Sequence, residues 1–327
     1  MVLVAPTWGL TMTTANTRLD DAARAGWLYY VAGNTQDQIA AKLGVSRQSA
    51  QRLVSLAMSE GLVKVRIDHP IARCLDLSQQ LTARFGLRFC EVTPSDPSSD
   101  SSTLGVALAT ATELENWLRR PEPAIIAMGT GRTLKAAIEL LPAIECPQHK
   151  VVSLTGSIAP DGSAAFYNVV FTMADKIQSR SYPMPLPVIA SSRQERDTLH
   201  RQAMIVATTE LAAKADVVFI GIGELGSKAP LFVDGFIDQA DLDALDAAGA
   251  VGEIVGWAYD RDGNLVEGLT NDKVASAALP DPSHALVIAA AMGRRKLPAI
   301  GAAMRGKLIN GLITDELTAE GLLKSRS

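Results

Sequence analysis

The residues of this chain with the clearest chemical potential lie in one stretch, AIIAMGTGRTL, at positions 124–134. An apolar run leads into a five-residue loop, and a helical pattern follows; the loop is Gly129, Thr130, Gly131, Arg132 and Thr133. Glycines let the backbone approach an anion, the start of a helix offers free N–H groups, and the hydroxyls and the guanidinium add donors. The spacing matches neither a nucleotide P-loop nor GxGxxG. The stretch predicts a phosphate or polyol cradle; the alternative is a turn whose glycines serve only its geometry.

Similar loops follow other apolar runs of the chain. They are Thr155-Gly156-Ser157, Gly221-Ile222-Gly223-Glu224 and Gly293-Arg294-Arg295-Lys296, and Asp260 follows a further run. Ligands of open α/β sheets bind beyond the carboxyl ends of the strands, so we expect these loops to converge on one crevice. Lys296 would supply a cation and Asp260 would accept bonds from sugar hydroxyls. The predicted effector-binding residues are therefore Gly129, Thr130, Gly131, Arg132, Thr133, Gly156, Gly221, Gly223, Asp260 and Lys296.

The sequence singles out no catalytic group. Its four histidines show no HxH or HExxH spacing, and it has neither a GxSxG elbow nor a CxxC pair. The three cysteines are widely scattered, which argues against a disulfide framework or a zinc site and favours a reducing compartment. We therefore predict neither an enzyme, nor a metal, nor a cofactor.

A second set of polar residues lies in TQDQIAAKLGVSRQSAQRLVSLAMSE, at positions 35–60. Thr35 and Gln38 form a capping box, Gly44 permits a tight turn, and Ser46 can cap a second helix. This pattern predicts the helix–turn–helix that inserts into a DNA major groove. The alternative is an ordinary helical hairpin with a solvated polar face. The predicted DNA-binding residues are Ser46, Arg47, Gln48, Gln51, Arg52 and Lys64.

Two flanking segments would support this pair of helices. A helix is expected over 19–31, with Ala22, Ala23, Trp27, Leu28 and Val31 directed inward. LVKVRI, at 62–67, alternates apolar and basic residues, which indicates a strand. That strand would be the wing of a winged helix with Lys64 towards phosphate, or else a solvated surface strand.

Composition and charge limit the class of protein. The chain has 327 residues, is 47% hydrophobic and 5% aromatic, and carries a formal net charge of −4. Between residues 18 and 73 we count eight Lys/Arg against five Asp/Glu, or +3, which leaves −7 elsewhere. A basic head on an acidic body suits a reader of specific DNA sites. No apolar run is long enough to span a bilayer, and the apolar start lacks a basic n-region, so a cytoplasmic protein is expected.

Beyond the helical head, strand and helix patterns alternate. Continuous apolar runs with intervening helices predict a mainly parallel sheet covered on both faces. The predicted fold class is α/β: an N-terminal helix–turn–helix (winged-helix-like) domain at 12–72, and a Rossmann-like three-layer α/β/α effector and oligomerisation domain at 73–327. Strands are expected at 87–92, 124–128, 151–154, 186–190, 217–222, 254–259, 285–290 and 308–314. Helices are expected at 75–85, 104–118, 132–141, 165–178, 194–214, 241–247, 297–305 and 316–323.

With these motifs, the chain resembles the SorC family of bacterial sugar-responsive transcriptional regulators. The resemblance spans about 19–323 and is carried by the helix–turn–helix, GTGRTL, GIGELGS and GRRKLPAIGAAMRGKLINGLITDE. It implies an effector domain similar to glucosamine-6-phosphate deaminase and ribose-5-phosphate isomerase, with the activity lost. It also implies that Gly129 to Thr133 and Lys296 hold a phosphate or terminal hydroxyls, and that the chain forms oligomers, often tetramers. The family enzymes' catalytic histidine is absent after GIG, where Glu224 follows.

The leading hypothesis is a regulator of a carbohydrate or polyol catabolic operon. Its partners would be double-stranded operator DNA and a small sugar, polyol or sugar phosphate. The alternatives are an active sugar-phosphate isomerase or deaminase with an appended helical module, and an oligomeric scaffold. Neither the identity of the effector nor the sign of regulation follows from these residues.

Overall fold

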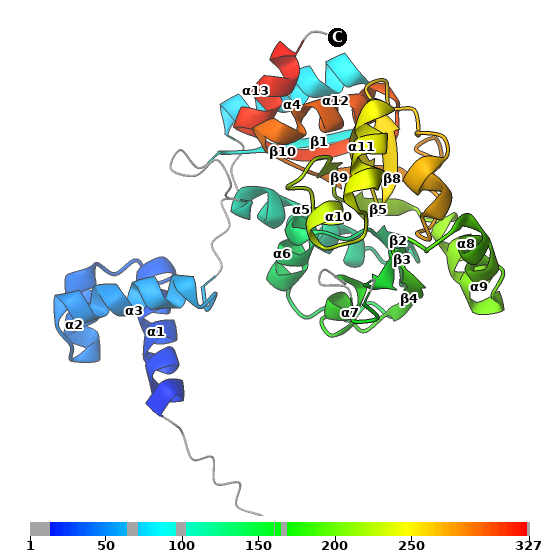
Figure 1. Cartoon of the computed structure of the whole chain (residues 1–327). Helices are drawn as coiled ribbons and strands as arrows, with labels where there is room; N and C mark the ends of the chain where they lie inside the picture. Colours follow the sequence, from blue (N-terminus) through cyan, green and yellow to red (C-terminus); the bar gives the residue numbers. More distant parts are fainter. Residues whose placement is uncertain (1–13, 64–70, 96–102, 160, 165–168, 326–327) are drawn as a thin grey trace, which may run out of the picture. The chain divides into compact units, whose positions relative to one another are not determined.

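The computed structural model describes residues 14–63, 71–95, 103–159, 161–164 and 169–325 (Figure 1). The chain divides into two compact units, 1–69 and 70–327. The expected boundary between residues 72 and 73 falls inside α4 (Ala72–Phe85). This helix packs on β1 and α13 of the second unit, which explains why the division comes before it. Within the described residues, no helix is both long and apolar enough to cross a membrane.

The first unit contains α1 (Thr14–Tyr30), α2 (Gln36–Leu43) and α3 (Arg47–Ser59). Helix α3 packs on both of the others, around a small core of Ala25, Ile39, Ala50 and Val54. The predicted capping box is present: Gln38 N–H donates to the Thr35 hydroxyl, and Thr35 N–H donates to the Gln38 side chain. Gly44 ends α2 with φ at 67°, a left-handed conformation that glycine adopts without strain. The predicted helix–turn–helix is therefore present.

The inward face of α1 was predicted in part wrongly. Trp27 and Val31 are 56% and 69% exposed, and Ala23 is exposed too. The buried positions are small, and Gly26 shows why: a Cβ there would lie 2.6 Å from Val63 and 2.9 Å from Ala57. The helices approach too closely at this point for a bulky side chain. Leu62 and Val63 are not in a strand, and the rest of the predicted wing, with Lys64, lies outside the described residues.

The second unit is built on a seven-stranded sheet in which every neighbouring pair is parallel. The order is β1-β10-β9-β5-β2-β3-β4. The strands are β1 (Phe89–Thr93), β2 (Ile125–Met128), β3 (Lys150–Ile158), β4 (Arg180–Pro187), β5 (Val217–Ile220), β9 (Leu286–Ala290) and β10 (Gly311–Asp315).

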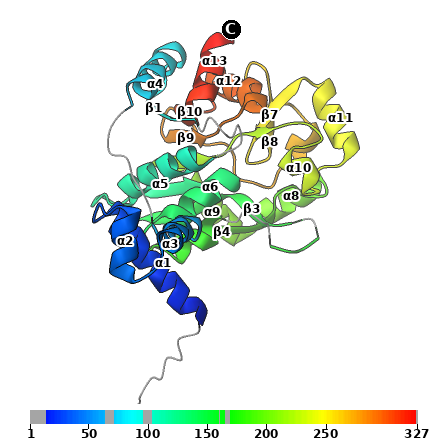
Figure 2. The ribbon, with the colours of Figure 1, turned by 90° about the vertical axis from the view of Figure 1, so that its left-hand side faces the viewer.

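Helices cover both faces of this sheet. In β2, Ile126 and Met128 pack towards α5 (Leu104–Leu118), α6 (Arg132–Leu140) and α7 (Val169–Ala174), whereas Ala127 faces the opposite layer. That layer contains α4, α9 (Ala203–Ala212), α12 (Leu297–Arg305) and α13 (Glu316–Lys324). Helices α4, α12 and α13 lie together in both views (Figures 1 and 2). The predicted three-layer α/β/α architecture is confirmed.

A smaller antiparallel sheet is inserted between β5 and β9. Its order is β6 (Gly223–Glu224), β7 (Ala250–Ile254) and β8 (Trp257–Asp260), with α10 (Pro230–Val233) and α11 (Gln239–Ala247) in its connection. The prediction of a single strand at 254–259 is wrong. The chain reverses at Val255 and Gly256, whose φ angles are 46° and 93°, so this segment contains the end of β7 and most of β8.

Two predicted helices also differ from the structure. The one predicted at 194–214 is interrupted and forms α8 (Arg193–His200) and α9. The one predicted at 165–178 is described only as α7, with residues 165–168 outside the described part. The short helices η1 (Leu269–Lys273) and η2 (Arg294–Lys296) complete the unit.

Candidate functional site

The winding of the sheet places the strand-end loops together. From β2 the chain continues to β3 and β4 on one side, and from the neighbouring β5 it continues to β9 and β10 on the other. The crevice at such a reversal is where open α/β sheets bind ligands. A cavity of about 610 Å³ lies there, lined by the loops after β2, β5 and β9. The predicted residues that line it are Thr130, Gly131, Arg132, Thr133, Gly156, Gly221, Gly223 and Lys296.

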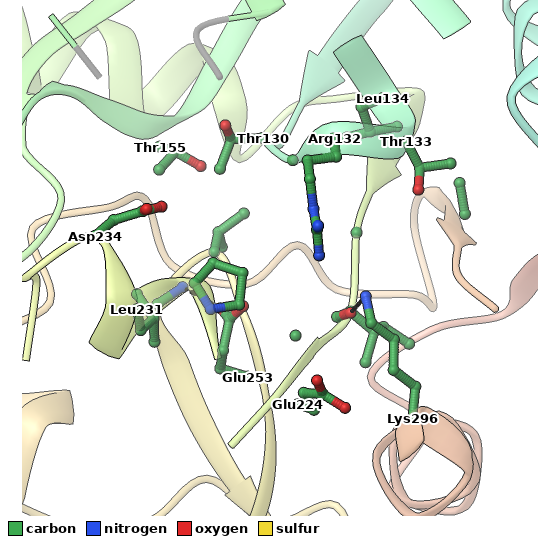
Figure 3. Close-up of a pocket in the computed structure, with 18 of the residues that line it drawn as sticks. Thr130, Arg132, Thr133, Leu134, Thr155, Glu224, Leu231, Asp234, Glu253 and Lys296 are labelled. Carbon is green, nitrogen blue, oxygen red and sulfur yellow. Dashed lines mark hydrogen bonds between the residues drawn. The ribbon is translucent and has the colours of Figure 1, made fainter. Parts of the chain in front are cut away.

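The loop after β2 directs the start of α6 into this cavity. Gly131 precedes the helix with φ at 129°, and no side chain caps its first turn. The first N–H groups of α6 are therefore left for an anion or a hydroxyl. The Arg132 side chain points into the cavity (Figure 3). Gly293 adopts a similar backbone angle, 112°, immediately before η2.

Lys296 reaches the cavity wall from η2, and its ammonium already has a partner. Its Nζ donates to the carbonyl oxygen of Ile222 at 2.6 Å. Burial lowers the pKa of Lys296, while the carboxylates of Glu253 and Glu224 act in the opposite direction. A cation held in this way contributes a fixed positive charge near a ligand.

Other glycines of the site make close packing possible. A Cβ on Gly156 would collide with the carbonyl oxygens of Leu186 and Pro187 on β4. At Gly129 it would lie 3.1 Å from both Ile220 and Val255. Gly129 itself is outside the cavity lining. Both glycines therefore let neighbouring segments approach closely. Gly156 also lines the cavity, whereas Gly129 shapes it only indirectly.

Asp260 is not part of this site, contrary to the prediction. It ends β8, and its carboxylate accepts the backbone N–H groups of Asp262 and Asn264, each at 2.9 Å. The side-chain amide of Asn264 donates to it as well. Asp260 therefore stabilises the turn that follows it. This turn is formed by the sequence Asp-Arg-Asp-Gly-Asn at 260–264, whose residue types favour turns.

Three carboxylates outside the predicted set of effector-binding residues line the cavity: Glu224, Asp234 and Glu253. Of these, only Glu224 belongs to a loop that was expected at the crevice. Glu224 is paired with Arg295, 3.3 Å away. On β7, Glu253 Oε2 accepts the N–H of Gly256 at 2.8 Å. Burial raises the pKa of Glu253, against the lowering effects of that N–H and of Lys296. A lone acid within the apolar run AVGEIVGWAY was the signal that could have identified Glu253.

The cavity is suited to a small polyhydroxylated ligand. It combines four cationic side chains (Arg132, Arg294, Arg295 and Lys296), a helix N-terminus, hydroxyls including the buried Thr155, and carboxylates that accept hydrogen bonds. Among the described residues, no cluster of His, Cys, Asp and Glu could hold a metal ion.

The helix–turn–helix presents the second candidate site. Ser46 caps α3 by accepting the N–H of Ser49. Arg47 Nε lies 3.4 Å from Asp37 of α2, and both side chains are more than two-thirds exposed. The predicted DNA-binding residues in the described part are all exposed: Ser46, Arg47, Gln48, Gln51 and Arg52. They form a polar surface at the start of α3, where such helices contact base edges and phosphates.

Known proteins resemble this chain along most of its length. Residues 69–324 match a family model described as "Putative sugar-binding domain". The erythritol catabolism regulatory protein EryD of Brucella abortus (strain 2308) is 31% identical over 302 residues, which cover 92% of this chain and 96% of EryD. The transcriptional regulator LsrR of Klebsiella pneumoniae subsp. pneumoniae is 31% identical over 307 residues, 92% of each chain.

A solved structure agrees with these sequence relatives. The full-length sorbitol operon regulator SorC of Klebsiella pneumoniae superposes with a TM-score of 0.71 at 26% identity, and the match covers 93% of this chain and 98% of that one. All three relatives are transcriptional regulators, not enzymes.

Proposed function

This chain belongs to the SorC family of sugar-binding transcriptional regulators, and we propose that it controls a carbohydrate or polyol catabolic operon. In this proposal the first unit binds double-stranded operator DNA, and the cavity of the second unit binds a small sugar, sugar alcohol or sugar phosphate. The observation that carries it is the convergence of Arg132, the α6 N-terminus and Lys296 on one cavity at the reversal of the sheet.

We assign the effector contacts from the hydrogen-bonding groups and charges of the side chains that line the cavity. Arg132, Thr130 and Thr133 would donate to a phosphate or to terminal hydroxyls, together with the free N–H groups of α6. Lys296 would add positive charge from the opposite wall. Because EryD is named for erythritol catabolism, four-carbon polyols and their phosphates are the first compounds to test.

DNA contacts are proposed for the start of α3. Arg47 and Arg52 would bond to phosphates or guanine, and Gln48 and Gln51 to base edges, with Ser46 at a phosphate. Lys64 would contact the backbone next to them. Two such heads would be needed to read a two-fold operator, so we propose a cytoplasmic homo-oligomer, a dimer or a tetramer.

Fluorescence anisotropy with DNA from the chain's own upstream region tests both halves of the proposal. We expect the full chain to bind this DNA and its affinity to change when a sugar, polyol or sugar phosphate is added. A thermal-shift screen of the same compounds would identify the effector, because a ligand of the folded state raises the melting temperature. Failure to bind its upstream DNA would favour the scaffold hypothesis, and turnover of a sugar phosphate would favour the enzyme.

A further inference from the structure

The short helix η2 is attached to the C-terminal helix α13 at both of its ends. It carries three consecutive cations that line the cavity: Arg294, Arg295 and Lys296. Immediately before η2, the N–H of Gly293 donates to the hydroxyl of Thr318 at 2.8 Å, and Thr318 is only 1% exposed. Immediately after η2, the Leu297 side chain lies over Gly321 of α13, where a Cβ would be 2.7 Å from Leu297 Cδ1. A shift of η2 must therefore displace α13 or break these contacts.

Helix α13 is also bonded to α4. Arg73 of α4 donates to the Glu320 carboxylate at 2.7 Å. Arg84 donates to the carbonyl oxygens of Leu323 and Ser325, each at 2.6 Å, at the helix end where carbonyl groups lack intrahelical partners. The two helices lie side by side in both views (Figures 1 and 2). Helix α13 thus connects η2 of the cavity with α4.

Helix α4 is the helix of the second unit that follows the head along the chain. The second unit starts at residue 70, and α4 starts at Ala72. A displacement of α4 therefore displaces the point at which the chain from the head enters the second unit. The links from η2 to α13 and from α13 to α4 are made by contacts among the described residues, and the last link is covalent.

An effector would act on this path by charge. Lys296 Nζ is bonded to the carbonyl oxygen of Ile222, and Arg295 lies 3.3 Å from Glu224, so both cations have partners on the segment that follows β5. An anionic group at the α6 N-terminus attracts these cations and competes with those partners. Because the cations belong to one short helix, a change in their positions is passed to its backbone.

On the premise of the proposed function, we propose that α13 transmits effector binding to the operator-binding head, and that Thr318 is the positioning residue that joins it to the cavity. Energetic coupling between distant sites can be carried by packed side chains and hydrogen bonds with two arrangements. Removal of the Thr318 hydroxyl should therefore leave both ligands able to bind but reduce the effect of one on the other. A purely structural role would lower stability without changing that effect.

Hydrogen exchange on the full chain tests the part of the path within the second unit. The probe is erythritol 4-phosphate, with inorganic phosphate as the minimal anion. We expect the probe to change exchange in 293–297 and also in α13 and α4. Thr318→Val should confine the change to 293–297, whereas Thr318→Ser should restore its extension. Thr110→Val is the matched control, because Thr110 is also buried in a helix but its hydroxyl bonds within α5, to Val106.

Anisotropy titrations test whether the path reaches the head. The coupling factor is the ratio of the operator Kd values with and without erythritol 4-phosphate. We expect Thr318→Val to bring this factor from the typical range of about 5- to 150-fold towards one. Arg73→Gln, at an exposed position where folding is not at risk, should act in the same direction because it breaks the ion pair between α4 and α13. Any direct effect of Arg73 on DNA affinity cancels in the ratio. Arg119→Gln, which breaks an exposed ion pair within α5, is its control.

The outcomes separate this inference from the proposed function. Unchanged exchange in α13 when the probe binds would overturn the inference and leave the proposed function intact, as would an unchanged coupling factor in both Thr318→Val and Arg73→Gln. Changes that extend through α13 and α4 in a chain that does not bind its upstream DNA would support the path and overturn the proposed function. If neither probe altered exchange anywhere, the proposed effector class would fall together with the inference.

Discussion

The Arg132 side chain is available to an effector. Among the described residues this side chain makes no hydrogen bond or ion pair, and it projects into the cavity. We expect Arg132→Gln to leave the free energy of unfolding within about 0.5 kcal/mol, because no internal contact is lost. Binding of a phosphorylated effector should weaken by about 1.5–3 kcal/mol, the range for a hydrogen bond to a charged group. Calorimetry measures the binding and urea unfolding the stability; Arg180→Gln, an exposed arginine outside the cavity, is the control.

Lys296 should behave differently, because its ammonium supports the structure. Lys296→Met would leave the Ile222 carbonyl without its donor and Glu253 without a nearby cation. We expect the free energy of unfolding to fall by about 1–3 kcal/mol, in addition to any loss of effector affinity. Urea unfolding checks this against Lys214→Met, an exposed lysine beyond α9. Unchanged stability would mean that the bond to Ile222 contributes nothing in solution.

Arg47, for which we propose a DNA contact, also makes an internal ion pair with Asp37. Its exposed pair with Asp37 is worth little, so Arg47→Ala should leave the head folded while operator affinity falls by about 1–3 kcal/mol. Asp37→Asn should strengthen operator binding, because it removes an acidic group that competes with DNA for the arginine. Anisotropy titrations measure both, with the exposed Arg24→Ala on α1 as control. Unaltered DNA affinity in Arg47→Ala would contradict the assignment of α3.

At the scale of elements, the start of α6 depends on one backbone angle. Gly131 has φ at 129°, which other residues adopt only with strain. Gly131→Ala should destabilise the second unit by about 1–3 kcal/mol or tilt the loop, and effector binding should be lost in either case. Gly162→Ala is the matched control, since Gly162 also has a positive φ, 84°, but lies outside the cavity lining. It should lower stability without affecting effector affinity, as measured by thermal unfolding and calorimetry.

Elements with a strong local signal were predictable. The helices at 104–118 and 297–305 have the predicted bounds, and β2 differs from its prediction by one residue. The loop residues Thr130 to Thr133 could be placed at the cavity because the carboxyl ends of parallel strands meet at one edge. These features are set by periodicity, capping and glycine positions within a few residues.

The failures concern contacts between distant parts of the chain. Nothing in the run from 254 to 259 reports that Val255 takes a positive φ and reverses the chain, so the β7–β8 hairpin was missed. Glu253 became a cavity residue through its pairing with Gly223, thirty positions earlier. Trp27 was assigned to a core because its spacing is helical, but the close approach at Gly26 excludes it. Hydrophobic periodicity predicts which face of a helix is buried, but it does not predict how large a side chain fits there.

At the scale of the whole molecule, two units with separate sites can regulate only through a shared equilibrium. An effector alters operator affinity if it binds one state of the full chain better than another. Thermodynamic linkage then requires operator DNA to change effector affinity by the same factor, which is about 5- to 150-fold in typical cases. We therefore expect the effector Kd, measured by calorimetry with and without saturating operator DNA, to shift by the factor that anisotropy gives for DNA with and without effector.

The direction of the shift identifies the mode of regulation. A larger effector Kd in the presence of operator means that the effector promotes release from DNA. A smaller Kd means that the effector promotes recruitment to DNA. Scrambled DNA of equal length is the control, because it occupies the basic head without the specific contacts. If the effector changed operator affinity while operator left the effector Kd untouched, the two measurements could not describe one equilibrium. Effector and DNA would then act on different populations of the protein, such as separate oligomers, and the concentration dependence of both titrations would reveal it.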